Sequence, residues 1–182
     1  MNVSTSQLRQ KLVSHLRRHA HVENDFDENQ AISDVYKAGE LSERQVDTLL
    51  YIHRRSDYNT NLNEEWAFKQ VLKMPSITEN QSGLVKTLAS VARYDNDFDE
   101  NEAVFDVLTH PKIGENQAQV MSSIARNSRY NNDFNENWAF GAVAKVSEFS
   151  QDKANELIDI HRSARYENGL DDDRVFLFAL TH

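Results

Sequence analysis

The chain has 182 residues, 39% of them hydrophobic and 27% charged, and its formal net charge is −9 at pH 7. This length and composition are typical of one folded domain or a short array of helical repeats, and they argue against a disordered chain. Because cysteine is absent, disulfides, thiolate metal sites and cysteine nucleophiles are excluded, and the negative charge argues against a nucleic-acid backbone as the general partner. The 5 glycines and 2 prolines are too few for the tight turns of an all-β fold, so helices are expected.

The start of the chain, residues 1–10, is polar and lacks the apolar run of a secretory signal. No later stretch approaches the ~18 apolar residues of a membrane-spanning helix. We therefore expect a soluble protein with no membrane contact, and the lack of cysteine fits a reducing cytoplasm. Ser4 and Gln7 form a helix start signal, so the chain is predicted to open on a helix.

A short acidic segment rich in Asp and Asn, called the acidic phrase below, recurs along the chain with a period of 36 residues. An unbroken period of this length is typical of stacked supersecondary units. The central apolar position of the phrase falls at Phe26, Leu62, Phe98, Phe134 and Leu170.

Each acidic phrase is followed by a segment with apolar residues at offsets of one and four, as at Ala31, Ile32 and Val35. Residues at these offsets share one face of a helix, so the segment is predicted to be an amphipathic helix. Helix-breaking residues end it in the first four copies, at Gly39, Pro75, Pro111 and Ser147.

A second helix is predicted after each of these breaks. Ser42 with Gln45 and Thr78 with Gln81 have the spacing of capping boxes, and each box follows an apolar residue. The unit is therefore a helix, an acidic turn and a second helix, in five copies with about ten helices. One such pair buries too little apolar surface alone, so the sequence predicts a single all-α domain, 1–182, in which the pairs stack as a solenoid. The expected pairs span approximately 4–38, 42–74, 78–110, 114–146 and 150–181.

The acidic turn has two interpretations. The alternation of Asp95, Asp97 and Asp99 resembles the ligand spacing of an EF-hand calcium loop, but Glu100 stands where that loop needs glycine. The other interpretation is helix capping, with a Glu three residues after the cap. We expect caps and no cofactor, with weak calcium binding at the third copy as the alternative. The predicted caps are Asp25, Asn61, Asp97 and Asp133.

Arginines recur near the predicted ends of the helices that precede the acidic turns. They either form a solvated ion ladder with neighbouring acids or bind acidic or phosphate groups of a partner, beside tyrosines of the turns. The arginines considered for a partner are Arg126, Arg129, Arg162 and Arg165.

Two departures from the repeat are candidate binding sites. Trp66 and Trp138 stand in a column that is polar in the other copies, so they are expected to be partly exposed, for a partner or for packing on the preceding turn. In the last helix Phe176, Leu177 and Phe178 form an apolar run where a solenoid end is normally polar. This run is predicted to meet another chain, including a second copy, or to fold back onto the fourth copy.

No catalytic motif is present, and His53 and His161 share a column but lie three copies apart, too far for joint metal ligation. We therefore expect a non-enzymatic protein–protein interaction module: an adaptor, inhibitor or assembly factor. The alternatives are a calcium-binding repeat protein and an acidic mimic that inhibits a nucleic-acid-binding protein.

Overall fold

The computed structural model describes residues 2–20, 25–56, 60–93, 96–128, 132–165 and 167–182. Within these ranges the chain forms ten α-helices and no strands, and 68% of the residues are helical. The predicted all-α fold is therefore confirmed. The odd-numbered helices are α1 (Thr5–Arg18), α3 (Glu43–Arg54), α5 (Glu79–Val91), α7 (Glu115–Asn127) and α9 (Gln151–Ser163). The even-numbered helices are α2 (Glu28–Lys37), α4 (Glu64–Leu72), α6 (Glu100–Thr109), α8 (Glu136–Lys145) and α10 (Asp172–Thr181).

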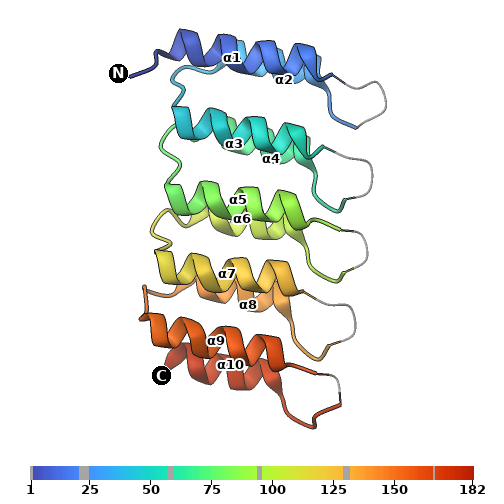
Figure 1. Cartoon of the computed structure of the whole chain (residues 1–182), viewed down its shortest axis with the longest axis vertical. Helices are drawn as coiled ribbons and strands as arrows, with labels where there is room; N and C mark the ends of the chain where they lie inside the picture. Colours follow the sequence, from blue (N-terminus) through green and yellow to red (C-terminus); the bar gives the residue numbers. More distant parts are fainter. Residues whose placement is uncertain (1, 21–24, 57–59, 94–95, 129–131, 166) are drawn as a thin grey trace.

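The helices lie in two layers that run the length of the molecule (Figure 1). Each odd-numbered helix packs on the even-numbered helix that follows it, and each pair packs on the next pair within both layers. One continuous core, from Leu8 in α1 to Phe176 in α10, fills the space between the layers. No described helix is long and apolar enough to cross a membrane.

Helices α3 and α5 begin at the predicted capping boxes. Ser42 and Thr78 accept hydrogen bonds from the backbone N–H groups of Gln45 and Gln81, and the glutamine side chains accept from the cap N–H groups in return. Both glutamine side chains are also fully buried. The reason is that Gln81 Nε2 donates to the Val107 and Leu108 carbonyls in the last turn of α6, at 3.0 and 3.4 Å. The capping residue thus also ties the two helices of a pair together.

The even-numbered helices begin two residues later than the sequence interpretation places them. The caps are not Asp25, Asn61, Asp97 and Asp133, because each helix starts at the Glu that was expected to be its third residue. Each observed cap accepts from the backbone N–H three residues on, as Asp99 Oδ1 does from Glu102 N at 3.0 Å. The caps are Asp27, Asn63, Asp99, Asn135 and Asp171.

The second residue of an even-numbered helix joins neighbouring pairs through their turns. Asn101 Oδ1 accepts from Asn63 N and its Nδ2 donates to Asn61 O, both at 2.7 Å. Asn137 makes the same two bonds one pair later, to Asp99 N at 2.7 Å and Asp97 O at 2.9 Å. The polar residues of the turns are therefore used largely to satisfy the backbone and to hold the stack in register.

Candidate functional site

The solvent-facing side of the even-numbered helices carries a row of large apolar residues. Trp66 on α4 and Trp138 on α8 are half-buried, Phe105 on α6 is 57% exposed and Leu177 on α10 is 44% exposed. We call this side of α4, α6, α8 and α10 the outer even face. Among the described residues, the odd-numbered helices carry none of the exposed large hydrophobic side chains. The two layers therefore differ in what they offer to a partner.

Trp66 and Trp138 are partly exposed, and both also pack on the core. The ring of Trp138 lies 6.2 Å, centroid to centroid, from the ring of Phe176 in the next pair, with the planes at 74°. The backbone N–H of each tryptophan donates to the cap of its own helix, Asn63 or Asn135. Both tryptophan side chains thus pack on the core and remain partly open to solvent, an arrangement that suits an anchor residue.

Phe105 is the residue of this face that the sequence analysis did not identify. It occupies a position that is Ser33 and Lys69, both half-buried, and Gly141, which is buried, in other copies. At Gly141 a side chain is excluded: an added Cβ would lie 2.9 Å from Asp106 Oδ2 of the neighbouring helix. An exposed phenylalanine in a polar or small column is the signal that points to Phe105.

The apolar run of the last helix is only partly on the surface. Phe176 is fully buried, because it continues the core column of Phe68 and Phe140 and packs edge-on against Phe134 at 5.2 Å. Its proposed role in contacting a partner is therefore wrong, and for this residue the alternative of folding back onto the fourth copy holds. Leu177 and Phe178 are exposed, and the Arg174 guanidinium lies over the Phe178 ring at 5.7 Å.

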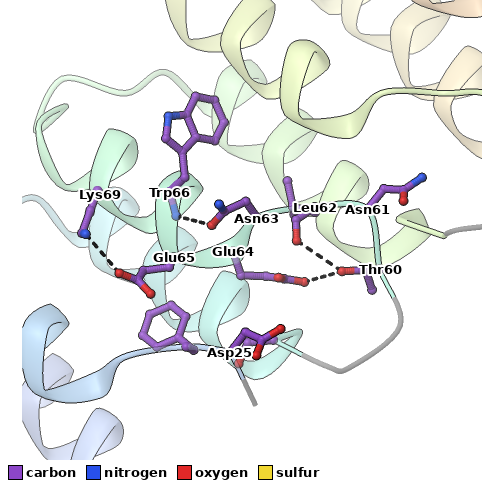
Figure 2. Close-up of a pocket in the computed structure, with 11 residues that line it drawn as sticks. Asp25, Thr60, Asn61, Leu62, Asn63, Glu64, Glu65, Trp66 and Lys69 are labelled. Atoms are coloured by element: carbon purple, nitrogen blue, oxygen red, sulfur yellow. Dashed lines mark hydrogen bonds and ion pairs between the residues drawn. The ribbon is translucent and has the colours of Figure 1, made fainter.

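Two hollows flank Lys69 on α4. The first, of about 470 Å³, lies at the start of α4 and is lined by Asp25, Glu65 and Trp66 among others (Figure 2). The second, of about 530 Å³, lies at the ends of α2 and α4. Figure 2 shows Lys69 Nζ paired with Glu65 Oε1, 3.0 Å apart and one turn away on the same helix. Glu65 raises the pKa of Lys69, so a cationic group stands between the hollows.

A second set of side chains lies inside the stack, where odd-numbered helices meet the starts of even-numbered helices. His53 Nε2 lies 3.0 Å from Glu28 Oε1, and its Nδ1 lies 3.0 Å from His15 Nε2. Burial, and next the proximity of His53, lower the pKa of His15 to about 4. His161 repeats the contact with Glu136 at 3.3 Å. These pairs are structural links between neighbouring helices, and they lie away from the outer even face.

Glu100 occupies the position of Glu28 and Glu136 but has no histidine opposite, because Ala125 stands at that position. It is fully buried, and neither of its carboxylate oxygens has a hydrogen-bond partner among the residues that the structure describes. Burial raises the pKa of Glu100 to about 7, and the nearby backbone N–H groups of Glu100 and Arg93 offset only part of the effect.

The proposed calcium ligands have other roles where the structure describes them. Asp99 caps α6, the carbonyl of Asp97 accepts from Asn137, and Asp95 lies outside the described residues. In the described ranges no group of three or more His, Asp and Glu side chains is placed to hold a metal ion. Of these three carboxylates, that of Asp99 is therefore accounted for as a helix cap.

The arginine columns do not form the expected ion ladder within the described part of the chain, where the ion pairs involve Lys and His. Arg126, Arg162 and Arg165 are exposed, and Arg126 Nε donates to Ser122 Oγ at 3.3 Å. Arg162 and Arg165 border a hollow at the outward side of α9 and α10. Arg129 lies outside the described residues.

No protein-family model matches this chain, and searches of the curated proteins and of the solved structures found no match.

Proposed function

We propose that this protein is a protein-binding helical solenoid that docks its partner along the outer even face. The observation that carries the proposal is the exposure of Trp66, Phe105 and Trp138, whole or partial, on three consecutive even-numbered helices. Aromatic side chains that are held at one edge and exposed at the other are enriched among residues that dominate binding energy. This surface and the cysteine-free sequence support a non-enzymatic adaptor or inhibitor that acts in the cytoplasm.

The chemistry of the face also indicates the kind of partner. Lys69 lies one turn from Trp66, the exposed Lys73 follows at the end of α4, and Lys145 ends α8, although the whole chain is acidic. A partner segment that offers apolar side chains with flanking carboxylates would match both the aromatic row and these lysines.

The experiment compares capture of partners by the wild-type chain and by two variants. Phe105→Ser with Leu177→Ser removes exposed apolar area from the outer even face without opening the core, since both side chains point to solvent. Arg126→Ser, on the exposed side of α7, is the matched control and tests the arginine column at the same time. Quantitative mass spectrometry should show partners lost from the double variant and kept by Arg126→Ser. The opposite pattern would indicate that the binding surface lies on the odd-numbered helices instead.

The tryptophan fluorescence of the chain provides a second test of this proposal. Its 2 tryptophans are Trp66 and Trp138, and both lie on the outer even face. Docking of a tryptophan-free partner segment should therefore shift their emission to shorter wavelength, because it removes water from the indoles. Binding with unchanged emission would contradict the proposed location.

A further inference from the structure

The outward side of the last helix pair exposes residues whose counterparts are buried in every earlier pair. Leu170 is 59% exposed and Val175 is 41% exposed, whereas Phe26 and Ala31, at the same positions of the first pair, are 5% and 3% exposed. The first pair has no pair packed before it, and its counterparts are still buried. These positions are therefore covered by the pair that follows.

We call this outward side of α9 and α10 the tail face. It carries Ile160, Leu170, Val175 and Phe178, and a shallow hollow of about 850 Å³ lies there, lined by Ile160, Arg162, Arg165 and Val175 among others. Phe178 belongs to this face because Asp106, at the same position of the third pair, contacts the following helix at Gly141. The tail face thus resembles the surface on which, elsewhere in the stack, the following helix pair packs.

The opposite end of the stack, the head face, is the outward side of α1 and α2. It carries Arg17, Asn29, Ile32 and Tyr36. Tyr36 is 64% exposed, whereas Leu72, at the same position of the next pair, is 8% exposed. In a later pair, the position of Tyr36 is therefore covered by the preceding pair.

The two faces match when the 36-residue register is continued from one copy of the chain into another. The backbone groups that a following pair would contact are Asp171 N–H and Gly169 C=O, by the pattern in which Asn137 contacts Asp99 and Asp97. Asn29 stands at the position of Asn137 and Asn101 on the head face and is exposed. It offers the same donor and acceptor to those two groups.

The charged and apolar positions match in the same register. Arg17 stands where His53 and His161 stand, and Asp172 stands where their partners Glu28 and Glu136 stand, so the junction brings a guanidinium to the buried carboxylate of Asp172.

Leu170 would meet Ile32 as Phe26 meets Phe68, whose ring centroids are 5.4 Å apart. We propose that the tail face binds the head face of a second copy of this chain, so that the solenoid continues head to tail from one molecule to the next. The interface is heterologous, and each open assembly keeps one free head and one free tail unless it closes into a ring. A pairing of two tail faces would leave Asp172 without a cation and would bring the acidic starts of two α10 helices together, which disfavours that arrangement.

The test uses two variants that each block one face. Arg17→Glu with Asn29→Ala blocks the head face, and Leu170→Asp with Val175→Arg blocks the tail face; all four side chains are exposed, so the fold should be kept, which circular dichroism checks. Sedimentation velocity of the wild-type chain from micromolar to millimolar concentration should show masses that rise beyond one chain. Each blocked variant alone should remain a monomer. An equimolar mixture should form a dimer and nothing larger, because one free head meets one free tail.

Arg18→Glu is the control for charge, since Arg18 is exposed and its column remains exposed at Arg54, Arg126 and Arg162. It should associate like the wild type. A wild-type chain that stays monomeric throughout, or a tail-blocked variant that is monomeric while the head-blocked variant still dimerises, would overturn the proposal. The inference does not rest on the proposed partner-binding function, because the variants leave Trp66, Phe105 and Trp138 unchanged.

Discussion

His161 Nε2 lies 3.3 Å from Glu136 Oε1, and both side chains are buried in the fourth and fifth pairs. One pair earlier, Glu100 stands at the position of Glu136 while Ala125 stands at the position of His161. The same buried carboxylate position thus has a histidine partner in the fourth pair and none in the third. This difference makes the stability of the protein depend on pH.

Glu100→Gln is expected to stabilise the protein above neutral pH. Burial raises the pKa of Glu100 from 4.5 to about 7, so the native state binds the proton more tightly than the unfolded state. The contribution of Glu100 is therefore neutral below the unfolded pKa, falls as the pH rises from 4.5 to about 7, and stays unfavourable above it. The full cost is about 3 kcal/mol at ~1.4 kcal/mol per pKa unit, so urea unfolding near pH 8 should show a gain of ~1–3 kcal/mol.

The matched control for this prediction is Glu136→Gln. Its carboxylate accepts from Asn132 Nδ2 at 2.7 Å and contacts His161, so replacement should destabilise the protein instead. A Glu100→Gln variant that is no more stable than the wild type near pH 8 would show that Glu100 carries no burial penalty.

Asp99→Ala and Asp97→Ala separate the observed cap of α6 from the cap that the sequence suggested. Asp99 Oδ1 accepts from Glu102 N, so its removal should cost about 1 kcal/mol of unfolding free energy. Asp97 is exposed and contributes its carbonyl to Asn137, so its replacement should change stability by less than ~0.5 kcal/mol. Equal losses of stability, or a larger loss for Asp97→Ala, would instead indicate Asp97 as the cap of α6.

Gln81→Ala is expected to be among the most destabilising polar replacements in the chain. It removes the acceptor for Thr78 N and the donor for the Val107 and Leu108 carbonyls in a buried site, at a cost of ~2–4 kcal/mol. Gln7→Ala is the comparison, because Gln7 makes the same bond to Ser4 N at 3.0 Å but is exposed. Denaturant unfolding should show at most ~1 kcal/mol for Gln7→Ala. Similar losses for the two variants would mean that only capping matters.

Asn137→Ala tests the amide link between neighbouring pairs. The side chain both accepts from Asp99 N and donates to Asp97 O, so its loss should cost ~1–3 kcal/mol and weaken the cooperativity of unfolding between the third and fourth pairs. Asn29→Ala removes the same side chain from the exposed head face, and dilute monomer should be affected by less than ~0.5 kcal/mol. An equal effect of both replacements would contradict the link.

Much of the helical architecture could be predicted because the signals are local and repeated. Ser42 with Gln45 and Thr78 with Gln81 mark helix starts within four residues, and the apolar columns mark the buried faces. The caps of the even-numbered helices were misplaced for a local reason as well. Asp97 and Asp99 are both good cap residues two positions apart, and only the backbone shows which of them precedes the first helical residue.

The surface could be predicted only in part, because exposure depends on neighbouring pairs. Trp66 and Trp138 were identified by their polar columns, and Phe105 would follow from the same comparison. Phe176 was misjudged because it adjoins the exposed Leu177 and Phe178, although its column is buried in the second, third and fourth copies. The burial penalty at Glu100 could not be predicted from the sequence, because it depends on Ala125, which belongs to a different pair.

The measurement that tests the central claim most directly is the affinity of a purified partner, identified by capture with the wild-type chain, for Phe105→Ala and for Arg126→Ala. Titration calorimetry should give a Kd at least ~10-fold weaker for Phe105→Ala, as expected when an exposed aromatic anchor is truncated, and an unchanged Kd for Arg126→Ala. An unchanged Kd for Phe105→Ala together with a weakened Kd for Arg126→Ala would contradict the claim that the outer even face is the binding surface.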